Sequence, residues 1–335
     1  MKVDAPLYSF ESPEPEVRRL EAKGYAAAFT FEGPHDPFFP LLLAARASER
    51  IELYTAVAIA FSRNPMILAN IGWDLQLLSR GRFLLGLGTQ IKTHIERRFS
   101  MPWSQPAARM REMVLAIKAI WRCWQEGAPL DFRGAFYQHT LMTPVFNPGP
   151  NAWGGPPIFL AGVGPRMTEV AGEVADGFFV HPFNTFESLH RLTLPAVERG
   201  LARSGRARDA IQVSAQLMIC SGTSDEEIER VRQSTKQQIA FYGSTPAYRP
   251  VLDVHGWGEL QVELNRMSKQ GRWAEMAGLV SDELLEAIAV CGPMRELAGR
   301  IRARCAGKVD RVSLVAHWTR DPDVWDDVVR DLSAD

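Results

Sequence analysis

Eight short apolar segments recur along the chain, most of them separated by longer amphipathic segments. Short apolar runs bounded by turn residues are typical of buried strands, whereas amphipathic runs with a period near 3.6 residues are typical of helices. Strands that alternate with helices form parallel sheets, and eight of them fit a closed (β/α)₈ TIM barrel better than a six-stranded open sheet. The eight predicted strands are 2–8, 25–32, 51–60, 82–88, 156–162, 177–180, 211–219 and 309–317.

Two segments depart from this alternation. Residues 129–155 are rich in proline, glycine and aromatic side chains, which predicts a hairpin and a loop. Residues 243–290 combine Trp257 and Trp273 with polar helical stretches, which predicts a helical insertion before the last crossover helix near Pro293. We expect one α/β domain over residues 1–335 with this insertion inside it. Insertions of this kind often cover the active-site face of a barrel.

The composition argues against several classes of binding partner. A net charge of −1 provides no field that would attract nucleic acid or an anionic membrane, so we expect a small-molecule substrate. No apolar run reaches the length of about 18 residues that a membrane helix needs, and no export segment opens the chain. The 4 cysteines and 7 histidines show no short metal-ligand spacing, so we expect no bound metal and a cytoplasmic protein.

Small residues end two of the predicted strands. One strand ends at Gly86-Leu87-Gly88-Thr89-Gln90, and the next ends at Gly162-Val163-Gly164. Glycine allows a flat or phosphorylated ligand to approach the backbone, and amides at a helix start can hold a phosphate. The glycines could instead serve only close helix packing, or belong to a nicotinamide-binding turn. The third glycine of that turn is absent, because Ile91 and Met167 stand in its place.

His35 follows the second predicted strand, where an imidazole could exchange a proton at neutral pH, so it is the candidate catalytic residue. Taken alone, its position favours a structural role for this histidine over a catalytic one. Asp36-Pro37 and Asn64-Pro65 have a simpler interpretation, since both pairs are typical of helix N-termini. His94, Arg97 and Arg98 follow the fourth strand, either near an anionic cofactor tail or on a solvated helix face.

The run LLSRGRFLLGLGTQ (77–90), preceded by TAVAIAFSRNPMILANIGWDLQ (55–76), resembles the bacterial luciferase-like superfamily of flavin and deazaflavin oxidoreductases. The resemblance continues through GGPPIFLAGVGPRMTEVAGEVADGFFV (154–180). Within the superfamily, EGPHDPF (32–38) and GLGTQIKTHIERRFSMPW (86–103) look most like the branch that uses coenzyme F420, an 8-hydroxy-5-deazaflavin.

The resemblance implies a set of cofactor contacts. It implies a cis peptide between Ala56 and Val57, after Thr55, against one face of the ring, and a phosphate held by the backbone of the fifth-strand loop. It also implies an acidic residue near the ring at Glu32 and a catalytic histidine close to His35. The residues that the resemblance assigns to cofactor binding are Glu32, Thr55, Ala56, Val57, Gly88, Thr89, Gln90, His94, Gly162, Val163 and Gly164.

The resemblance implies an F420-dependent oxidoreductase that moves a hydride between deazaflavin carbon C5 and an organic substrate. Two alternatives remain open: an FMN-dependent monooxygenase of the same fold, and a flavin- or deazaflavin-binding protein without turnover. Ile91 stands where the deazaflavin-dependent sugar-phosphate dehydrogenases carry a glutamate, which argues against a sugar phosphate. Because relatives are often dimers, we also expect a homodimer.

Overall fold

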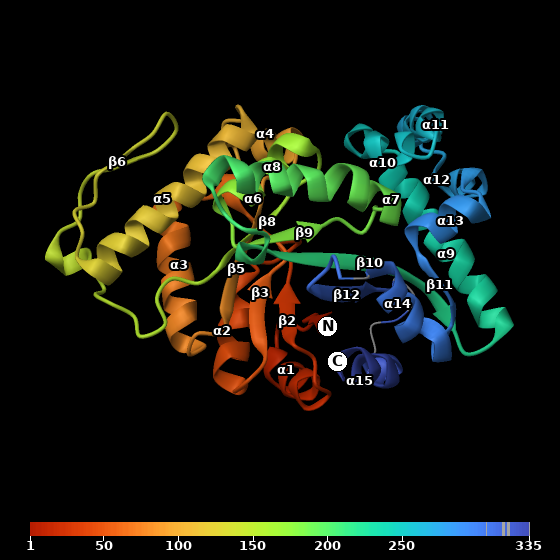
Figure 1. Ribbon diagram of the computed structural model, residues 1–335, viewed down its shortest axis with the longest axis horizontal. Coiled ribbons are helices and arrows are strands. Elements are labelled where there is room, and N and C mark those ends of the chain that lie inside the picture. The colour runs from red at the N-terminus through yellow and green to blue at the C-terminus, as the bar shows by residue number, and fades with distance from the viewer. Residues whose placement is uncertain (306, 317–318, 320–321, 335) are drawn as a thin grey trace.

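The computed structural model describes residues 1–305, 307–316, 319 and 322–334 and contains a closed barrel of eight parallel strands (Figure 1). Strand β10 pairs with both β9 and β12, and β12 pairs with β1, so the sheet closes on itself. The predicted TIM barrel is therefore confirmed, and the open sheet of a nicotinamide dehydrogenase is excluded. The barrel strands are β1 (Lys2–Pro6), β2 (Ala27–Thr30), β3 (Glu52–Thr55), β5 (Phe83–Gly88), β8 (Ile158–Ala161), β9 (Gly177–Val180), β10 (Gln212–Gly222) and β12 (Arg311–Val315).

Helices surround the barrel, and side-chain hydrogen bonds lie at the start of two of them, α2 beginning at Phe38, one residue later than Asp36-Pro37 predicts. Asn64 accepts a hydrogen bond from the Ile67 amide, and Pro65 occupies the first helical position, so α3 starts where the sequence predicts. Asp36 accepts from the Phe38 amide at the start of α2. The helices of this outer layer are α1 (Pro13–Ala22), α2 (Phe38–Ala47), α3 (Pro65–Leu78), α4 (Lys92–Arg97), α5 (Pro106–Glu126), α6 (Pro165–Val174), α7 (Phe186–Ser188), α8 (Leu194–Ser204), α14 (Leu297–Cys305) and α15 (Asp326–Ser333).

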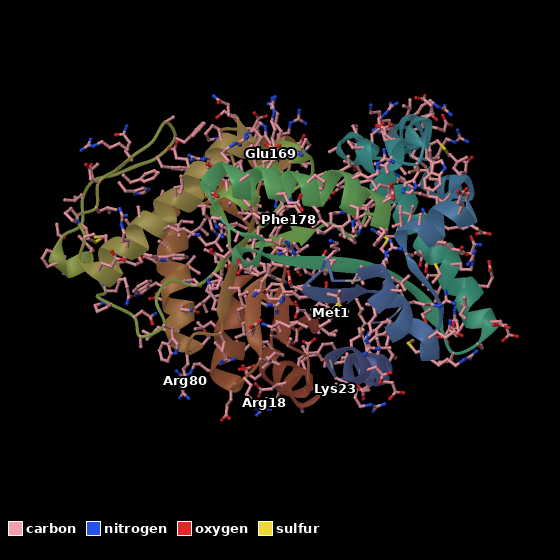
Figure 2. The ribbon with its side chains drawn as sticks, in the orientation of Figure 1. Met1, Arg18, Lys23, Arg80, Glu169 and Phe178 are labelled. Carbon is pink, nitrogen blue, oxygen red and sulfur yellow. The ribbon has the colours of Figure 1, made fainter. Side chains whose placement is uncertain are left out.

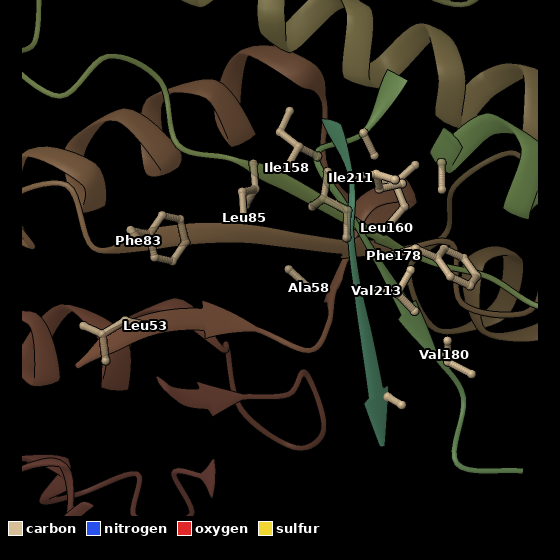
Figure 3. Packing of buried hydrophobic residues seen from close by; sticks show 14 of the residues in the cluster. Leu53, Ala58, Phe83, Leu85, Ile158, Leu160, Phe178, Val180, Ile211 and Val213 are labelled. Atoms are coloured by element: carbon tan, nitrogen blue, oxygen red, sulfur yellow. The ribbon is translucent and has the colours of Figure 1, made fainter. Parts of the chain in front are cut away.

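Strand β5 shows how the alternation of side chains builds two cores. Phe83, Leu85 and Leu87 belong to the large cluster between the strands and the helices, part of which is drawn in Figure 3. Leu84 belongs instead to the cluster inside the barrel, with aromatic residues from neighbouring strands. Gly86 and Gly88 share the inward face of Leu84, because side chains alternate along a strand. Side chains therefore fill the barrel interior up to the level of Gly86, and the interior is open from there towards the C-terminal end of β5.

A buried ion pair lies at the opposite end of the barrel interior. The Arg311 guanidinium donates to both carboxylate oxygens of Asp4, at 2.7 and 2.9 Å, and its side chain is 1% exposed. It also pairs with Glu52 at 2.7 Å, while the Tyr54 hydroxyl donates to Asp4 at 2.9 Å. Burial alone would lower the pKa of Arg311, but the charge and hydrogen bonds of Asp4 raise it above its usual value.

The observed strands differ from the predicted ones in three places. The predicted strand 51–60 is divided into β3 and β4 (Ala58–Ile59), and its centre carries the turn described below. The predicted last strand, 309–317, is observed as β12, and its final residue His317 lies outside the described residues. A further strand, β11 (Val290–Pro293), was not predicted and pairs in parallel with the end of β10 beyond the barrel. The long β10 is thus shared between the barrel and the insertion.

The two irregular segments lie on different sides of the molecule. Strands β6 (Phe132–Arg133) and β7 (Gln138–His139) form an antiparallel hairpin, which extends from the α5 side of the molecule (Figure 1). On the other side lie α9 (Asp225–Gly243) and the insertion helices, which share a separate apolar cluster. The insertion helices are α10 (Arg249–Asp253), α11 (Gly258–Lys269), α12 (Trp273–Met276) and α13 (Asp282–Ile288). None of the helices in the described parts of the chain combines the length and apolarity that crossing a membrane requires.

Candidate functional site

A cavity of about 1560 Å³ opens at the carboxyl ends of the barrel strands. Its wall includes Val57, Gly88, Ala161 and Gln216 from the strand ends, and Tyr248 from the segment before α10. Pockets for a single small molecule usually measure about 300–1000 Å³. This cavity therefore has room for a large ligand together with a second, smaller one. Active sites of TIM barrels lie at this end of the strands.

A cis peptide bond joins Ala56 and Val57, as the resemblance implies. The Ala56 amide donates to the Thr30 carbonyl at 2.7 Å, and the Glu32 amide donates to the Val57 carbonyl at 3.2 Å. The end of β2 and the residues just after it therefore hold both sides of the turn. Ala56 and Val57 line the cavity, so this turn forms part of its wall.

Thr55 and Glu32 support this turn and are not part of the cavity wall defined by the described residues. The fully buried Thr55 hydroxyl donates to the Gly86 carbonyl at 2.6 Å and accepts from the Gly86 amide at 3.1 Å, which ties β3 to β5. The Glu32 carboxylate accepts from the Ile59 amide and from Arg63, both at 2.7 Å. Direct contact of either side chain with a cofactor stays a prediction. The observed contacts of both side chains are with other residues of the protein.

Glycines allow two close contacts in the cavity wall. A Cβ atom on Gly88 would lie 2.6 Å from Cγ2 of Val57, so glycine preserves the space beside the cis turn. A Cβ atom on Gly162 would lie 2.3 Å from Cγ of Met167. Gly164 has a φ of 90°, a conformation that favours glycine, and it directly precedes the N-terminus of α6. Gly162, Val163 and Gly164 all line the cavity.

The structure separates the remaining predicted site residues into two groups. Thr89 and Gln90 line the cavity, and Gln90 adopts a left-handed φ of 60°. His94 on α4 is exposed and lies outside the wall that the described residues form. His35 is also exposed outside this wall, where its ring stacks on Phe10 with centroids 4.1 Å apart. The predicted catalytic histidine is thus not brought together with the cis turn.

The cavity contains another histidine, His181, which the sequence analysis missed. It follows β9, two residues after the inward-facing Phe179, so strand alternation places it on the same face at the cavity. Its Nδ1 accepts from the Phe183 amide at 3.1 Å, and its Nε2 lies 3.0 Å from the Tyr248 hydroxyl oxygen. Burial lowers the pKa of the imidazole to about 4, so the ring is neutral at neutral pH.

This pKa makes the stability of the fold depend on pH. The imidazole of the unfolded chain gains a proton near pH 6.5, whereas that of folded His181 stays neutral until about pH 4. We therefore expect the free energy of unfolding to decrease, by about 1–2 kcal/mol after allowance for contact with cavity water, as pH falls across this window. Urea unfolding at several pH values, compared between the wild type and His181→Gln, measures this contribution. Parallel curves for the two proteins would contradict it.

Ion pairs connect the helices that form the outer rim of the cavity. Glu169 on α6 pairs with Arg199 and Arg203 on α8, and its position is marked in Figure 2. Glu173, also on α6, pairs with Arg111 on α5 at 2.7 Å. These contacts fix α6 against its neighbours, and with it the turn at Gly164 that opens into the cavity.

Comparison with known proteins places the chain among related enzymes. The family model described as luciferase-like monooxygenase matches residues 15–311. An uncharacterized protein of Mycobacterium tuberculosis is 55% identical over 293 residues, 88% of this chain and 86% of that protein. A 5,10-methylenetetrahydromethanopterin reductase of Archaeoglobus fulgidus is 28% identical over 282 residues, 81% of this chain and 79% of that protein.

A solved structure has a similar fold. The coenzyme F420 dependent tetrahydromethanopterin reductase from Methanopyrus kandleri matches with a TM-score of 0.76. The alignment covers 100% of this chain and 97% of that chain, at 20% sequence identity. At this identity the likeness shows the fold.

Proposed function

The chain belongs to the luciferase-like monooxygenase family, and from that premise we propose that it is an F420-dependent oxidoreductase. Among the relatives, the solved reductase from Methanopyrus kandleri is F420 dependent by name, and this supports the choice of cofactor. The observation that carries the proposal is the cis turn at Val57, which packs against Gly88 at the wall of the cavity. The part of the cavity beside this turn, which we call the slot, belongs to a space large enough for a cofactor and a substrate.

The residues at this slot fit a flat ring with a phosphate-bearing tail. Val57 would contact one face of the ring, because it lines the cavity and the absence of a Cβ atom at Gly88 gives its side chain room beside β5. The backbone at Gly162, Val163 and Gly164 would hold the phosphate next to the first turn of α6, where amide groups point outward. Thr89 and Gln90 would line the ring side of the slot.

When bound, the deazaflavin supplies hydride transfer at ring carbon C5. The protein's part is to orient the ring, to exclude water and to hold the substrate against it. Glu32 and Thr55 contribute by fixing the cis turn from two strands, which keeps Val57 in position. A role for His35 or His94 in this site stays a prediction.

Cofactor titration tests this function. We expect the purified protein to quench F420 fluorescence with a saturable curve and to retain no FMN through gel filtration. The opposite pattern would support the alternative, a flavin monooxygenase. A protein that binds F420 but catalyses no oxidation or reduction of F420 with any substrate would support the non-catalytic alternative. Absence of binding to both cofactors would overturn the proposal.

A homodimer also stays a prediction. The segment that follows the β6–β7 hairpin presents Leu141, Val145 and Phe146 with 76%, 82% and 75% of their surface exposed. Clustered exposed apolar side chains often mark a protein interface, and a second copy of the chain would cover them.

A further inference from the structure

We propose that the Tyr248 hydroxyl, oriented by His181, donates a hydrogen bond and then a proton to a carbonyl oxygen of the substrate. The inference rests on the proposed F420-dependent function and adds to it a substrate class and a proton donor. Both residues line the cavity, but they come from different parts of the fold. His181 follows a barrel strand, whereas Tyr248 ends the short helix η5 (Pro246–Tyr248) at the start of the insertion.

Hydrogen bonding fixes the tautomer of His181. The Phe183 amide can only donate, so the Nδ1 atom that accepts from it carries no hydrogen. Because the ring is neutral, its hydrogen is on Nε2, which therefore donates to the Tyr248 oxygen at 3.0 Å. The two rings are also stacked, with centroids 4.5 Å apart, and the edge of His181 contacts Tyr242. The direction of this hydrogen bond follows from the local contacts alone.

The Tyr248 hydroxyl is left with a hydrogen to donate. Its oxygen accepts from His181, and its hydrogen has no acceptor among the described residues. Burial and the neighbouring Tyr242 raise the pKa of Tyr248 to about 12, so the hydroxyl keeps this hydrogen at neutral pH. A donor at the wall of a largely apolar cavity favours a ligand with an acceptor oxygen. A ketone or aldehyde group meets this requirement and is also a hydride acceptor.

The chemistry balances for reduction of a carbonyl. Hydride adds to the carbonyl carbon, the π electron pair moves to the oxygen, and this oxygen takes the proton of Tyr248. The substrate is reduced to an alcohol while the cofactor is oxidised. The Nε2–H of His181 stabilises the resulting tyrosinate until water returns a proton. The reverse sequence oxidises an alcohol.

The experiment uses the full-length protein with reduced F420 and a panel of carbonyl compounds, from acetone and cyclohexanone to long-chain methyl ketones and aldehydes. We expect turnover of at least one compound, and a loss of about 100- to 1000-fold in kcat for Tyr248→Phe with little change in KM. The control Tyr242→Phe keeps the same ring packing and should retain its rate, because Tyr242 is not among the described residues that line the cavity.

The pH profile is a further readout. Wild-type kcat should stay level between about pH 6 and 9, since the pKa values of His181 and Tyr248 both lie outside this range.

A second readout does not need turnover. Nitrogen NMR of the cofactor-free protein should show the neutral Nε2–H tautomer of His181 at pH 6, with a shifted Nε2 signal in Tyr248→Phe and an unshifted one in Tyr242→Phe. Finding the hydrogen on Nδ1 would overturn the assignment of Tyr248 as a donor.

The outcomes separate this inference from the proposed function. Failure to bind F420 would overturn the function itself. Binding of F420 without turnover of any carbonyl compound would overturn the substrate class and leave the cofactor assignment standing. Wild-type turnover by a folded Tyr248→Phe would overturn the role of Tyr248. If that variant does not fold, His181→Leu tests the orientation of the hydroxyl, because leucine has no group that can donate to the Tyr248 oxygen; wild-type turnover by this folded variant would overturn the role of the His181–Tyr248 pair.

Discussion

Arg311→Met is expected to lower the free energy of unfolding by about 3–5 kcal/mol, because it leaves the carboxylate of Asp4 buried without its partner. The side chain of Asp4 is 0% exposed, so water cannot replace the lost guanidinium. The Tyr54 hydroxyl would remain as a donor to Asp4 but carries no charge. Urea denaturation followed by circular dichroism measures the change.

Two companion variants test the cause of this loss. Arg295→Met removes an arginine whose side chain is 80% exposed, and we expect a change of less than about 0.5 kcal/mol. Asp4→Asn combined with Arg311→Met removes both charges and should recover about 1 kcal/mol or more relative to Arg311→Met alone. Equal stability of Arg311→Met and Arg295→Met would show that the ion pair contributes nothing.

Gly88→Val is expected to weaken F420 binding by about 100-fold or more, equivalent to about 2.7 kcal/mol. The first added carbon would already lie 2.6 Å from the Val57 side chain, so the two side chains must compete for the space beside the cis turn. One of them is then displaced into the slot. Fluorescence titration with F420 measures the dissociation constant.

The matched control for this variant is Gly299→Val on the exposed face of α14. A Cβ atom there meets nothing within 4 Å, so we expect unchanged F420 affinity. Thermal unfolding of both variants establishes that they are folded. Wild-type F420 affinity in a folded Gly88→Val protein would mean that the ring does not occupy the slot next to Val57.

Much of the fold could be predicted because its determinants are local. The alternation in β5 separates Phe83, Leu85 and Leu87 from the inward-facing positions, and Asn64-Pro65 fixes the start of α3. β11 could not be predicted in this way, since it pairs only with the part of β10 that continues beyond the barrel. Pairing between strands so far apart in sequence leaves no periodic signal in either one.

The site was predicted less completely, and the reasons differ between residues. The cis bond after Ala56 came only from the family resemblance, since a buried strand is all that the local pattern indicates. His181 had a usable signal, because it extends the inward series of Gly177 and Phe179 by one step. Its partner Tyr248 lies 67 residues away in the sequence, and nothing local in that segment indicates their contact.

The division of β10 between two apolar clusters has an evolutionary consequence. The barrel and the insertion each pack around their own interior, yet both border the same cavity. Substitutions between residues 243 and 290, other than at Tyr248, can therefore reshape the substrate side of the cavity without disturbing the barrel wall on which a coenzyme would rest. A library of variants in this stretch that keeps Tyr248 should diversify substrate preference while preserving the proposed proton donor.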